Sequence, residues 1–522
     1  MSRPSHESRS VSTALAAAGR LLRDHPAAVL PAYLLSIGLT TAARVPLTVG
    51  VGVAAASLAA TGRLEALVRA VVDLQEAVRG AGGPSATEPG SVPAGVAEAL
   101  ADAAANAVTP TVVAALGLGL VLAFLVGLLA GALGSAVTYG AVWGGIDGRA
   151  PLVAGVRAAG RWRTFLGIAV VRLAAVGVAV AAPLAAASAL AVTPSVIAGD
   201  PATGAVAILA TLGLAALGAV VAIGAVFLLA FAEPAAIVDG TGALPSVRAS
   251  LGFVRDHPAH AVGFALVAVG GYVAAAVAVG VANAAGAGSL GGIVLPLLVS
   301  PLLNAGATAL YAGGPGPTPV EHPGVRTRVR RTLGLGWSEF AGFVRGHAVA
   351  VLAALATLAG GVAAGYATTA PYGVTASGPA DVAGVFGTVP IGPFVTIAAN
   401  NWLVSAGLAY GGIAFGVPAV SGLLFNGVLV GALAGVFDRT AFLALVAPHG
   451  VLELPVIAVA GGLGLHLGGV GWRAVRDRAS AETVAGELQR AAYVLVGVGV
   501  LLVVAAAIEA FLTPRIAAAV LA

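Results

Sequence analysis

Two ionisable side chains lie four residues apart in an apolar stretch near the end of the chain. His449 and Glu453 belong to the run Pro-His-Gly-Val-Leu-Glu-Leu-Pro, residues 448–455. Side chains at positions i and i+4 share one face of a helix, so the imidazole and the carboxylate are expected to be neighbours. Such a pair can exchange a proton, bind a metal ion or hold two helices together. Because unpaired charges are costly to bury, both residues are candidates for a function.

The depth of this pair depends on where its helix begins. Pro448 is expected to open the helix, because proline is tolerated in the first turn. Glu453 would then lie about 6 Å along the helix axis, near the positive end of the helix dipole. In the alternative, the preceding run Ala-Phe-Leu-Ala-Leu-Val-Ala-Pro enters the membrane first and places the pair deeper. We expect His449 and Glu453 to face the protein interior near Asn401 or Asn426; the alternative is a cap at the helix start among outer headgroups.

A zinc site would need more ligands than this pair supplies. Zinc sites have at least three protein ligands, and His449 and Glu453 give two. His466 lies about 220° round the same helix from Glu453, at 100° per residue, and points away. The chain has no cysteine, which excludes disulfides, thiol catalysis and thiolate metal sites. We therefore expect neither a metal nor another cofactor.

Asparagines and glycines recur in the apolar segments of the last third. Asn426 precedes Gly427, which begins a series of glycines at four-residue steps. Such glycines make a smooth helix face that a neighbouring helix can approach closely. We expect the asparagines to form hydrogen bonds across that contact. The candidate site residues are Asn400, Asn401, Asn426, Gly427, His449, Gly450, Glu453 and Pro455.

The composition is that of a membrane protein. Of the 522 residues, 59% are hydrophobic and 9% are charged, and the mean hydropathy is +1.00. Soluble proteins carry about 25% charged residues, so a soluble enzyme, a disordered chain and a nucleic-acid-binding protein are excluded. Long apolar runs, rather than the alternating strands of a barrel, predict an all-α polytopic fold. All 26 basic residues are arginine, which together with the abundant Ala, Val and Gly suggests a GC-rich source, such as a halophilic archaeon or an actinobacterium.

About eleven transmembrane helices are predicted, at roughly 20 residues for each span. They fall into two blocks, 1–315 and 336–522, joined by a basic linker over 316–335 that is rich in Gly and Pro. Glycine and proline typically mark such boundaries. The expected spans lie near 26–60, 110–146, 164–190, 204–231, 259–284 and 290–312 in the first block, and near 347–367, 391–416, 419–437, 449–471 and 490–512 in the second.

The placement of arginine predicts the orientation in the plasma membrane. Arginines cluster in alternate connections between spans, and the positive-inside rule assigns these connections to the cytoplasm. The N-terminus is then cytoplasmic and the C-terminus is outside. The outer connection 61–109 also carries arginines, balanced by acids. It is predicted to form a hairpin of two short helices with an i,i+4 pair between Glu65 and Arg69.

A short motif recurs where three spans begin. The run Arg-Asp-His-Pro occurs twice and Arg-Gly-His once, around His25, His257 and His347. We interpret each as an amphipathic in-plane helix, a sharp turn and a span, with Arg and His at headgroup level. The first such helix is expected over 11–22. Lipid anchoring is the favoured role; a ligand or proton path shared by the three histidines is the alternative.

The last third resembles the stage II sporulation protein M family over roughly 336–515. The resemblance rests on Asn400 with Asn401, on Asn426 with Gly427, and on His449 and Gly450 with Glu453 and Pro455 before a Gly-rich span. It implies a five-span block and a non-enzymatic membrane subunit, which in spore-forming bacteria recruits and holds cell-wall hydrolases. The block 1–315 has no counterpart in the short bacterial form, so the sporulation role is not carried over.

The leading functional hypothesis is a non-catalytic integral membrane scaffold or complex subunit, because no nucleotide-binding loop, catalytic triad or soluble catalytic domain is visible. Its expected partners are membrane lipids and a membrane or envelope protein, not nucleic acid. A transporter or lipid-handling permease is the first alternative, since intramembrane polar residues, Glu233 among them, are compatible with a midplane site. An intramembrane metal-dependent hydrolase is the second.

Overall fold

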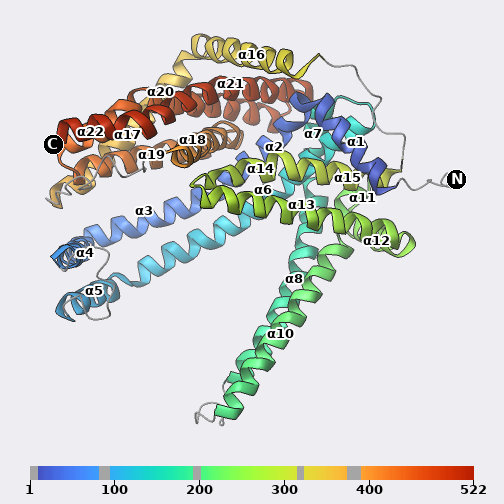
Figure 1. Cartoon of the computed structure of the whole chain (residues 1–522), viewed down its shortest axis with the longest axis horizontal. Helices are drawn as coiled ribbons and strands as arrows, with labels where there is room; N and C mark the ends of the chain where they lie inside the picture. The colour runs from blue at the N-terminus through green and yellow to red at the C-terminus, as the bar shows by residue number, and fades with distance from the viewer. Residues whose placement is uncertain (1–9, 81–93, 192–200, 314–322, 373–389, 522) are drawn as a thin grey trace. The chain divides into compact units, whose positions relative to one another are not determined.

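The computed structural model describes residues 10–80, 94–191, 201–313, 323–372 and 390–521 (Figure 1). These residues form helices and no strand, which confirms the all-α fold. Ten helical segments among them are long and apolar enough to cross a membrane, so the chain is a polytopic membrane protein. The remaining predicted span, 391–416, contains the helix α18, Ile391–Gly411. It is long enough to cross a bilayer, but its Asn, Thr and Pro residues make it less apolar than the ten.

The helices group into two compact units, which are described separately. Unit 1 comprises residues 1–36, 131–278 and 294–323, and unit 2 comprises 37–130, 279–293 and 324–522. Segments 37–130 and 279–293 of the predicted first block thus belong to unit 2. Residues 314–322 of the predicted boundary lie outside the described residues.

The described residues of unit 1 form most of its α-helices, some of them only in part. These are α1 (Val11–Asp24), α2 (Pro26–Thr41), α6 (Pro110–Ile146), α7 (Pro151–Ala158), α8 (Trp162–Ala191), α10 (Pro201–Leu228), α11 (Ala232–Val238), α12 (Ala243–Asp256), α13 (Pro258–Ala284) and α15 (Ser300–Ala312), with the 3-10 turn η1 (Ala159–Arg161) and the π-helical segment η3 (Leu295–Val299). Figure 1 shows α8 and α10 side by side as a long hairpin. They approach closely at Gly218, where a methyl group would lie 2.6 Å from the carbonyl oxygen of Ala179.

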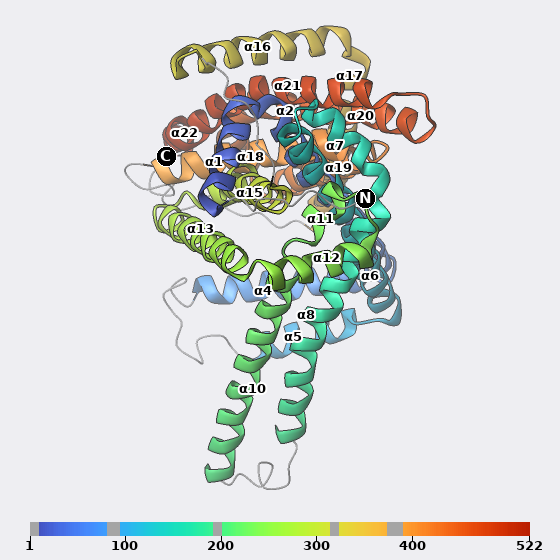
Figure 2. The same cartoon turned by 90° about the vertical axis from the view of Figure 1, so that its right-hand side faces the viewer.

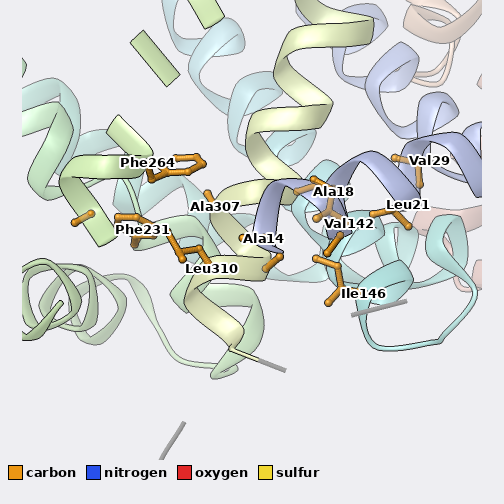
Figure 3. Packing of buried hydrophobic residues seen from close by; sticks show 14 of the residues in the cluster. Ala14, Ala18, Leu21, Val29, Val142, Ile146, Phe231, Phe264, Ala307 and Leu310 are labelled. Carbon is orange, nitrogen blue, oxygen red and sulfur yellow. The ribbon is translucent and has the colours of Figure 1, made fainter. Parts of the chain in front are cut away.

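The apolar face of α1 forms part of the core of unit 1. Ala14, Ala18 and Leu21, which lie in the helix expected over 11–22, are fully buried. Their burial removes apolar surface from solvent and so stabilises the docked helix. Figure 3 shows the cluster that they join, with Val29, Val142, Ile146, Phe231, Phe264, Ala307 and Leu310.

Unit 2 contains the predicted second block together with the helices of the 61–109 hairpin. Its elements are α3 (Arg44–Ala60), α4 (Arg63–Gly80), α5 (Ala94–Ala107), η2 (Gly288–Leu290), α14 (Gly291–Val294, in part), α16 (Val325–Gly346), α17 (Ala348–Thr369), η4 (Ala370–Tyr372), α18, α19 (Val417–Val436), α20 (Arg439–Val475), α21 (Ala481–Ala507), the π-helical segment η5 (Ile508–Leu512) and α22 (Thr513–Leu521). Helix α16 lies alongside α21 (Figure 2). The predicted hairpin is confirmed, because α4 and α5 pack together and Arg69 of α4 pairs with Glu65.

The recurring motif has the same backbone form at its three sites. His25, His257 and His347 each follow the last residue of a helix, with φ/ψ of −130°/42°, −132°/53° and −126°/37°. Each backbone N–H donates to the carbonyl four residues earlier, at 2.9, 2.9 and 2.8 Å. A span then begins at the next residue. The predicted order of helix, sharp turn and span is therefore confirmed.

Candidate functional site

Helices α17 and α19 pack backbone against backbone through glycines. A methyl group at Gly361 of α17 would lie 2.6 Å from the carbonyl oxygen of Leu424 in α19. From the other side, a methyl group at Gly427 or Gly431 would collide with carbonyl oxygens of α17. The predicted glycine face on α19 is thus confirmed as a close helix contact, of the kind that small residues permit in membranes.

The asparagines do not bridge this contact as expected. Asn426 donates to the carbonyl of Gly422 in its own helix, at 2.7 Å. Asn400 is exposed, and its amide lies 3.4 Å from Oδ1 of the adjacent Asn401. The bond across the contact comes from Thr369 of α17, whose hydroxyl donates at 3.1 Å to the carbonyl of Ala432 in α19. A threonine can supply it because its short side chain fits where the backbones touch.

Helix α20 does not begin at Pro448, so that expectation is wrong. The helix starts directly after Asp438, whose Oδ1 accepts the backbone N–H groups of Thr440 and Ala441 at 2.9 and 3.1 Å. Such a cap satisfies two of the free N–H groups at a helix start. The acidic cap and the apolar turn after it therefore define the start of the helix.

Pro448 and Pro455 both lie inside the continuous helix α20. An irregular backbone exposed to lipid is so costly that a membrane helix continues through proline rather than ending there. Gly450 is buried between them, and Pro455 is exposed. Glu453 consequently lies roughly 20 Å along the helix from Arg439, at 1.5 Å per residue, rather than the roughly 6 Å expected from a start at Pro448.

His449 and Glu453 meet Glu509, a residue of η5. One ligand atom from each of the three side chains lies within 4.8 Å of the other two. Nε2 of His449 is 3.9 Å from Oε2 of Glu509, and the side chains of these two residues are 14% and 24% exposed. Oε2 of Glu453 is buried and has no hydrogen-bond partner among the described residues. We call His449, Glu453 and Glu509 the acidic triad.

Thr513, the first residue of α22, contacts the imidazole from the other side. Its Oγ1 lies 3.4 Å from Nδ1 of His449, and its hydroxyl donates to the carbonyl of Ile508 at 3.2 Å. Thr513 is buried. The neighbours of the His449–Glu453 pair are therefore Glu509 and Thr513, rather than the asparagines that the sequence favoured.

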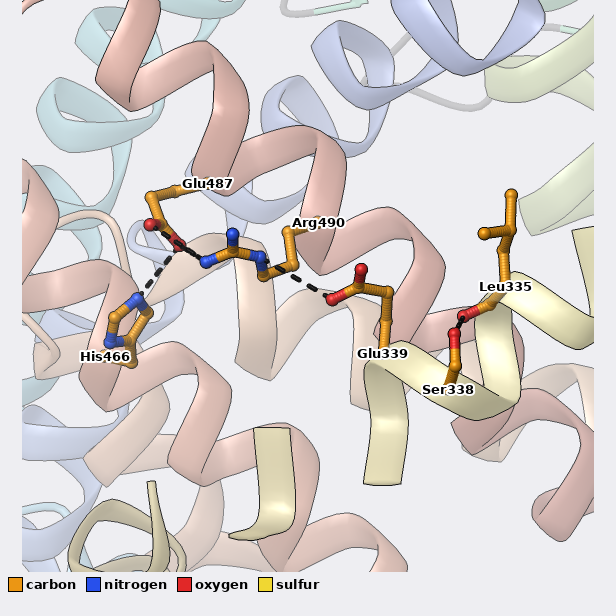
Figure 4. Close-up of polar contacts among 6 residues, drawn as sticks. All are labelled: Leu335, Ser338, Glu339, His466, Glu487 and Arg490. Atoms are coloured by element: carbon orange, nitrogen blue, oxygen red, sulfur yellow. Dashed lines mark hydrogen bonds and ion pairs between the residues drawn. The ribbon is translucent and has the colours of Figure 1, made fainter. Parts of the chain in front are cut away.

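A second polar cluster joins α16 to α20 and α21 (Figure 4). Nε2 of His466 lies 3.2 Å from Oε2 of Glu487. Arg490 donates to Glu487 at 3.3 Å and lies 3.6 Å from Glu339. Both carboxylates share the guanidinium of Arg490, so each has an arginine beside it. His466 points away from the acidic triad, as its position on the helix predicted.

The motif histidines do not share a set of carboxylate partners. Asp256 accepts a hydrogen bond from Arg255 at 2.9 Å, which lowers the pKa of that exposed carboxyl. Asp24 lies 3.8 Å from Arg23. The ring of His347 stacks on Phe343 at 4.7 Å. Arginine pairing and aromatic contact suit the anchoring role better than a proton path.

Glu233, the acidic residue considered for a transport site, is neutralised within unit 1. Arg172 of α8 contacts its two carboxylate oxygens at 2.6 and 2.7 Å. The Glu233 side chain is 8% exposed. A second hydrogen-bonded group of unit 1 links Tyr139 and Tyr33 through Asn304, at 3.3 and 3.2 Å.

Glu509 is the residue of the site that sequence analysis missed. It is an isolated carboxylate in the run Val-Val-Ala-Ala-Ala-Ile-Glu-Ala-Phe-Leu. Ionisable residues inside membrane spans are rare and usually have a function, so its position alone was a usable signal. A search for ligands along one helix only misses Glu509, because this residue belongs to η5, the segment that follows α21.

Comparison with known families supports the resemblance for the C-terminal part of the chain. A family model described as stage II sporulation protein M matches residues 348–514. This range contains the predicted motif residues and the whole acidic triad. No curated protein and no solved structure matches the chain.

Proposed function

We propose that the chain is a non-catalytic integral membrane scaffold, a subunit that holds a membrane or envelope protein in a fixed place. The similarity of residues 348–514 to stage II sporulation protein M supports a membrane protein of that family. The observation that carries the proposal is the backbone-to-backbone contact between α17 and α19.

The contact between α17 and α19 holds the two helices rigidly against each other. Because glycines lie at the contact, no long side chains there can change rotamer and let the helices slide. The same packing extends to α20, where a methyl group at Gly462 would lie 2.9 Å from Cα of Val351 in α17. Alternating access requires parts of a bundle to move against each other, so tightly locked helices suit a scaffold better than a transporter.

The proposed orientation has a cytoplasmic N-terminus and an external C-terminus in the plasma membrane. Its support is the positive-inside rule. Helix α16 has Arg326, Arg330 and Arg331 among its exposed residues. A basic helix of this kind is attracted to anionic headgroups of the cytoplasmic leaflet.

Cross-linking in native membranes tests the scaffold. The tagged full chain is cross-linked, solubilised and analysed by mass spectrometry, as wild type and as Gly361→Leu and Gly360→Leu variants. Gly360 is a matched control on the same helix, because a methyl group there would meet nothing within 4 Å. We expect one partner in stoichiometric amount with wild type and Gly360→Leu, and several-fold less partner per chain with Gly361→Leu.

Two outcomes would reject the scaffold. One is a chain that yields no stoichiometric partner in cross-linked native membranes. The other is a purified chain that, alone in liposomes, transports or hydrolyses a substrate. Chain levels in the membrane are measured for each variant, so that a loss of partner is not confused with a loss of protein.

A further inference from the structure

The acidic triad presents three hydrogen-bond acceptors to one another and no donor. The hydroxyl of Thr513 donates to the carbonyl of Ile508, so its oxygen is left to accept from Nδ1–H of His449. In the neutral imidazole only one ring nitrogen carries a proton. Nε2 of His449 therefore presents a lone pair towards Oε2 of Glu509, at 3.9 Å.

The charge of the triad is not balanced by arginine. None of the ion pairs that the structure describes joins Glu453 or Glu509 to an arginine, whereas Glu233 and Glu487 each have one. Arg439 and Arg515, the arginines nearest in sequence on α20 and α22, are exposed. Two carboxylates and an imidazole lone pair within a membrane-spanning region thus need either protons or a bound cation to offset their charge.

The local backbone brings the third ligand to the site. Glu509 lies in η5, where the helix adopts π-helical hydrogen bonding over Ile508–Leu512. A π-helical turn rotates the following side chains relative to an ordinary α-helix, and such turns are frequent at functional sites. The contact between α20 and η5 therefore combines ligands from two helices that the sequence alone does not pair.

The ligand set suits a divalent transition metal. Imidazole and carboxylate together are typical ligands of Zn²⁺, at about 2.0–2.2 Å, and three protein ligands leave one coordination position open. Two such ligands in a tetrahedral site lie roughly 3.4 Å apart. The separations of up to 4.8 Å would have to shorten by as much as about 1.4 Å on binding, through rotation of the Glu453 and Glu509 side chains.

We propose that His449, Glu453 and Glu509 bind one Zn²⁺ ion, with Thr513 holding the imidazole in the required tautomer. The contact between Nδ1 and the Thr513 hydroxyl, at 3.4 Å, would take the place of the carboxylate, carbonyl or water that usually accepts from a metal-binding histidine. The ion links α20 to the C-terminal segment formed by η5 and α22. A shallow groove lined by Leu443, Pro448, Ile516 and Val520 opens beside the site.

Zinc binding by the purified full chain tests this proposal. Chelator-stripped protein in detergent is titrated with Zn²⁺ against a chromophoric competitor, and bound metal is counted by mass spectrometry. We expect one zinc per chain, and at least roughly a tenfold lower affinity for His449→Gln, Glu453→Gln and Glu509→Gln, with a similar or smaller loss for Thr513→Val. Millimolar Mg²⁺ is not expected to compete, because imidazole is a poor ligand for it.

The second cluster supplies matched controls on the same two helices. His466→Gln and Glu487→Gln remove the same residue types from a cluster that has its own arginine, Arg490, and they should leave zinc affinity unchanged. Less than stoichiometric zinc on monodisperse wild-type protein would overturn the proposal, as would an equal loss of affinity in the control variants. The zinc titration and the cross-linking experiment test different proposals. Glu509→Gln is therefore also cross-linked in native membranes, where retention of the partner is measured separately from zinc affinity.

Discussion

Nε2 of His449 lies 3.9 Å from Oε2 of Glu509, across the contact between α20 and η5. In the neutral tautomer that donates Nδ1–H to Thr513, the imidazole turns a lone pair towards the carboxylate. In the absence of a cation the triad is therefore a source of repulsion rather than of stability.

Whether Glu509 lowers or raises the free energy of unfolding can be measured in metal-free protein. Glu509→Gln removes one negative charge and adds an amide donor within reach of the unpartnered Oε2 of Glu453. We expect the free energy of unfolding to rise by about 1 kcal/mol, the net value of a typical hydrogen bond. Thermal unfolding in detergent with a chelator measures it. Glu487→Gln should have the opposite sign, because Glu487 pairs with Arg490, and a destabilised Glu509→Gln would contradict the acceptor-only description.

The buried ion pair of unit 1 should be costly to break. Glu233→Gln leaves the Arg172 guanidinium without its counter-charge, and loss of one partner of a buried pair costs about 3 kcal/mol or more. Asp147→Asn is the matched control, because Asp147 pairs with Arg149 at 2.8 Å but is 45% exposed. We expect that control to change stability by less than about 1 kcal/mol. Equal effects of the two substitutions on the melting temperature would show that burial is not decisive.

Two adjacent glycines of α17 should respond differently to the same substitution. Gly361→Ala forces a methyl group against the backbone of α19, and such overpacking typically costs about 1–3 kcal/mol. Gly360→Ala meets open space and replaces a poor helix former, so stability should stay the same or rise by up to about 1 kcal/mol. Thermal unfolding of the two variants side by side tests the contact, and indistinguishable curves would argue against it.

The start of α20 should depend on one side chain. Asp438→Ala removes the acceptor of two backbone N–H groups and should lower stability by about 1 kcal/mol. Asp438→Asn should retain most of it, because Asn is an equally good cap. Ser338→Ala is a suitable control, since its hydroxyl only donates to Leu335 in its own helix. Unchanged unfolding of Asp438→Ala would mean that the helix start is held by packing alone.

The fold class could be predicted because hydropathy reports directly on a bilayer. The order of helix, sharp turn and span could also be predicted, since the Arg-x-His motif recurs with the same backbone at His25, His257 and His347. The start of α20 could not be predicted, because the preference of proline for the first turn of a helix is a rule for helices that end in water. In lipid the cost of an open backbone outweighs the single hydrogen bond that Pro448 removes.

The site itself could be predicted only in part. The spacing of His449 and Glu453 fixed two members on one helical face. Glu509 required knowing which helix packs beside that face, and a π-helical turn decides the direction in which its side chain points. Spacing rules relate residues on one element, whereas contacts between elements depend on packing that no local pattern encodes.

The length of α20 has a consequence for the depth of the triad. The helix has 37 residues, or roughly 55 Å at 1.5 Å per residue, against a hydrocarbon core of about 30 Å. Such an excess is accommodated by tilt or by projection from the bilayer. His449 lies roughly 15 Å from the first residue of the helix. With the excess length shared equally between the two ends, the triad lies close to one boundary of the hydrocarbon core, where a change of a few ångströms in bilayer thickness would move it between headgroups and acyl chains. Lipid chain length thereby becomes a variable that sets the polarity around the three ligands.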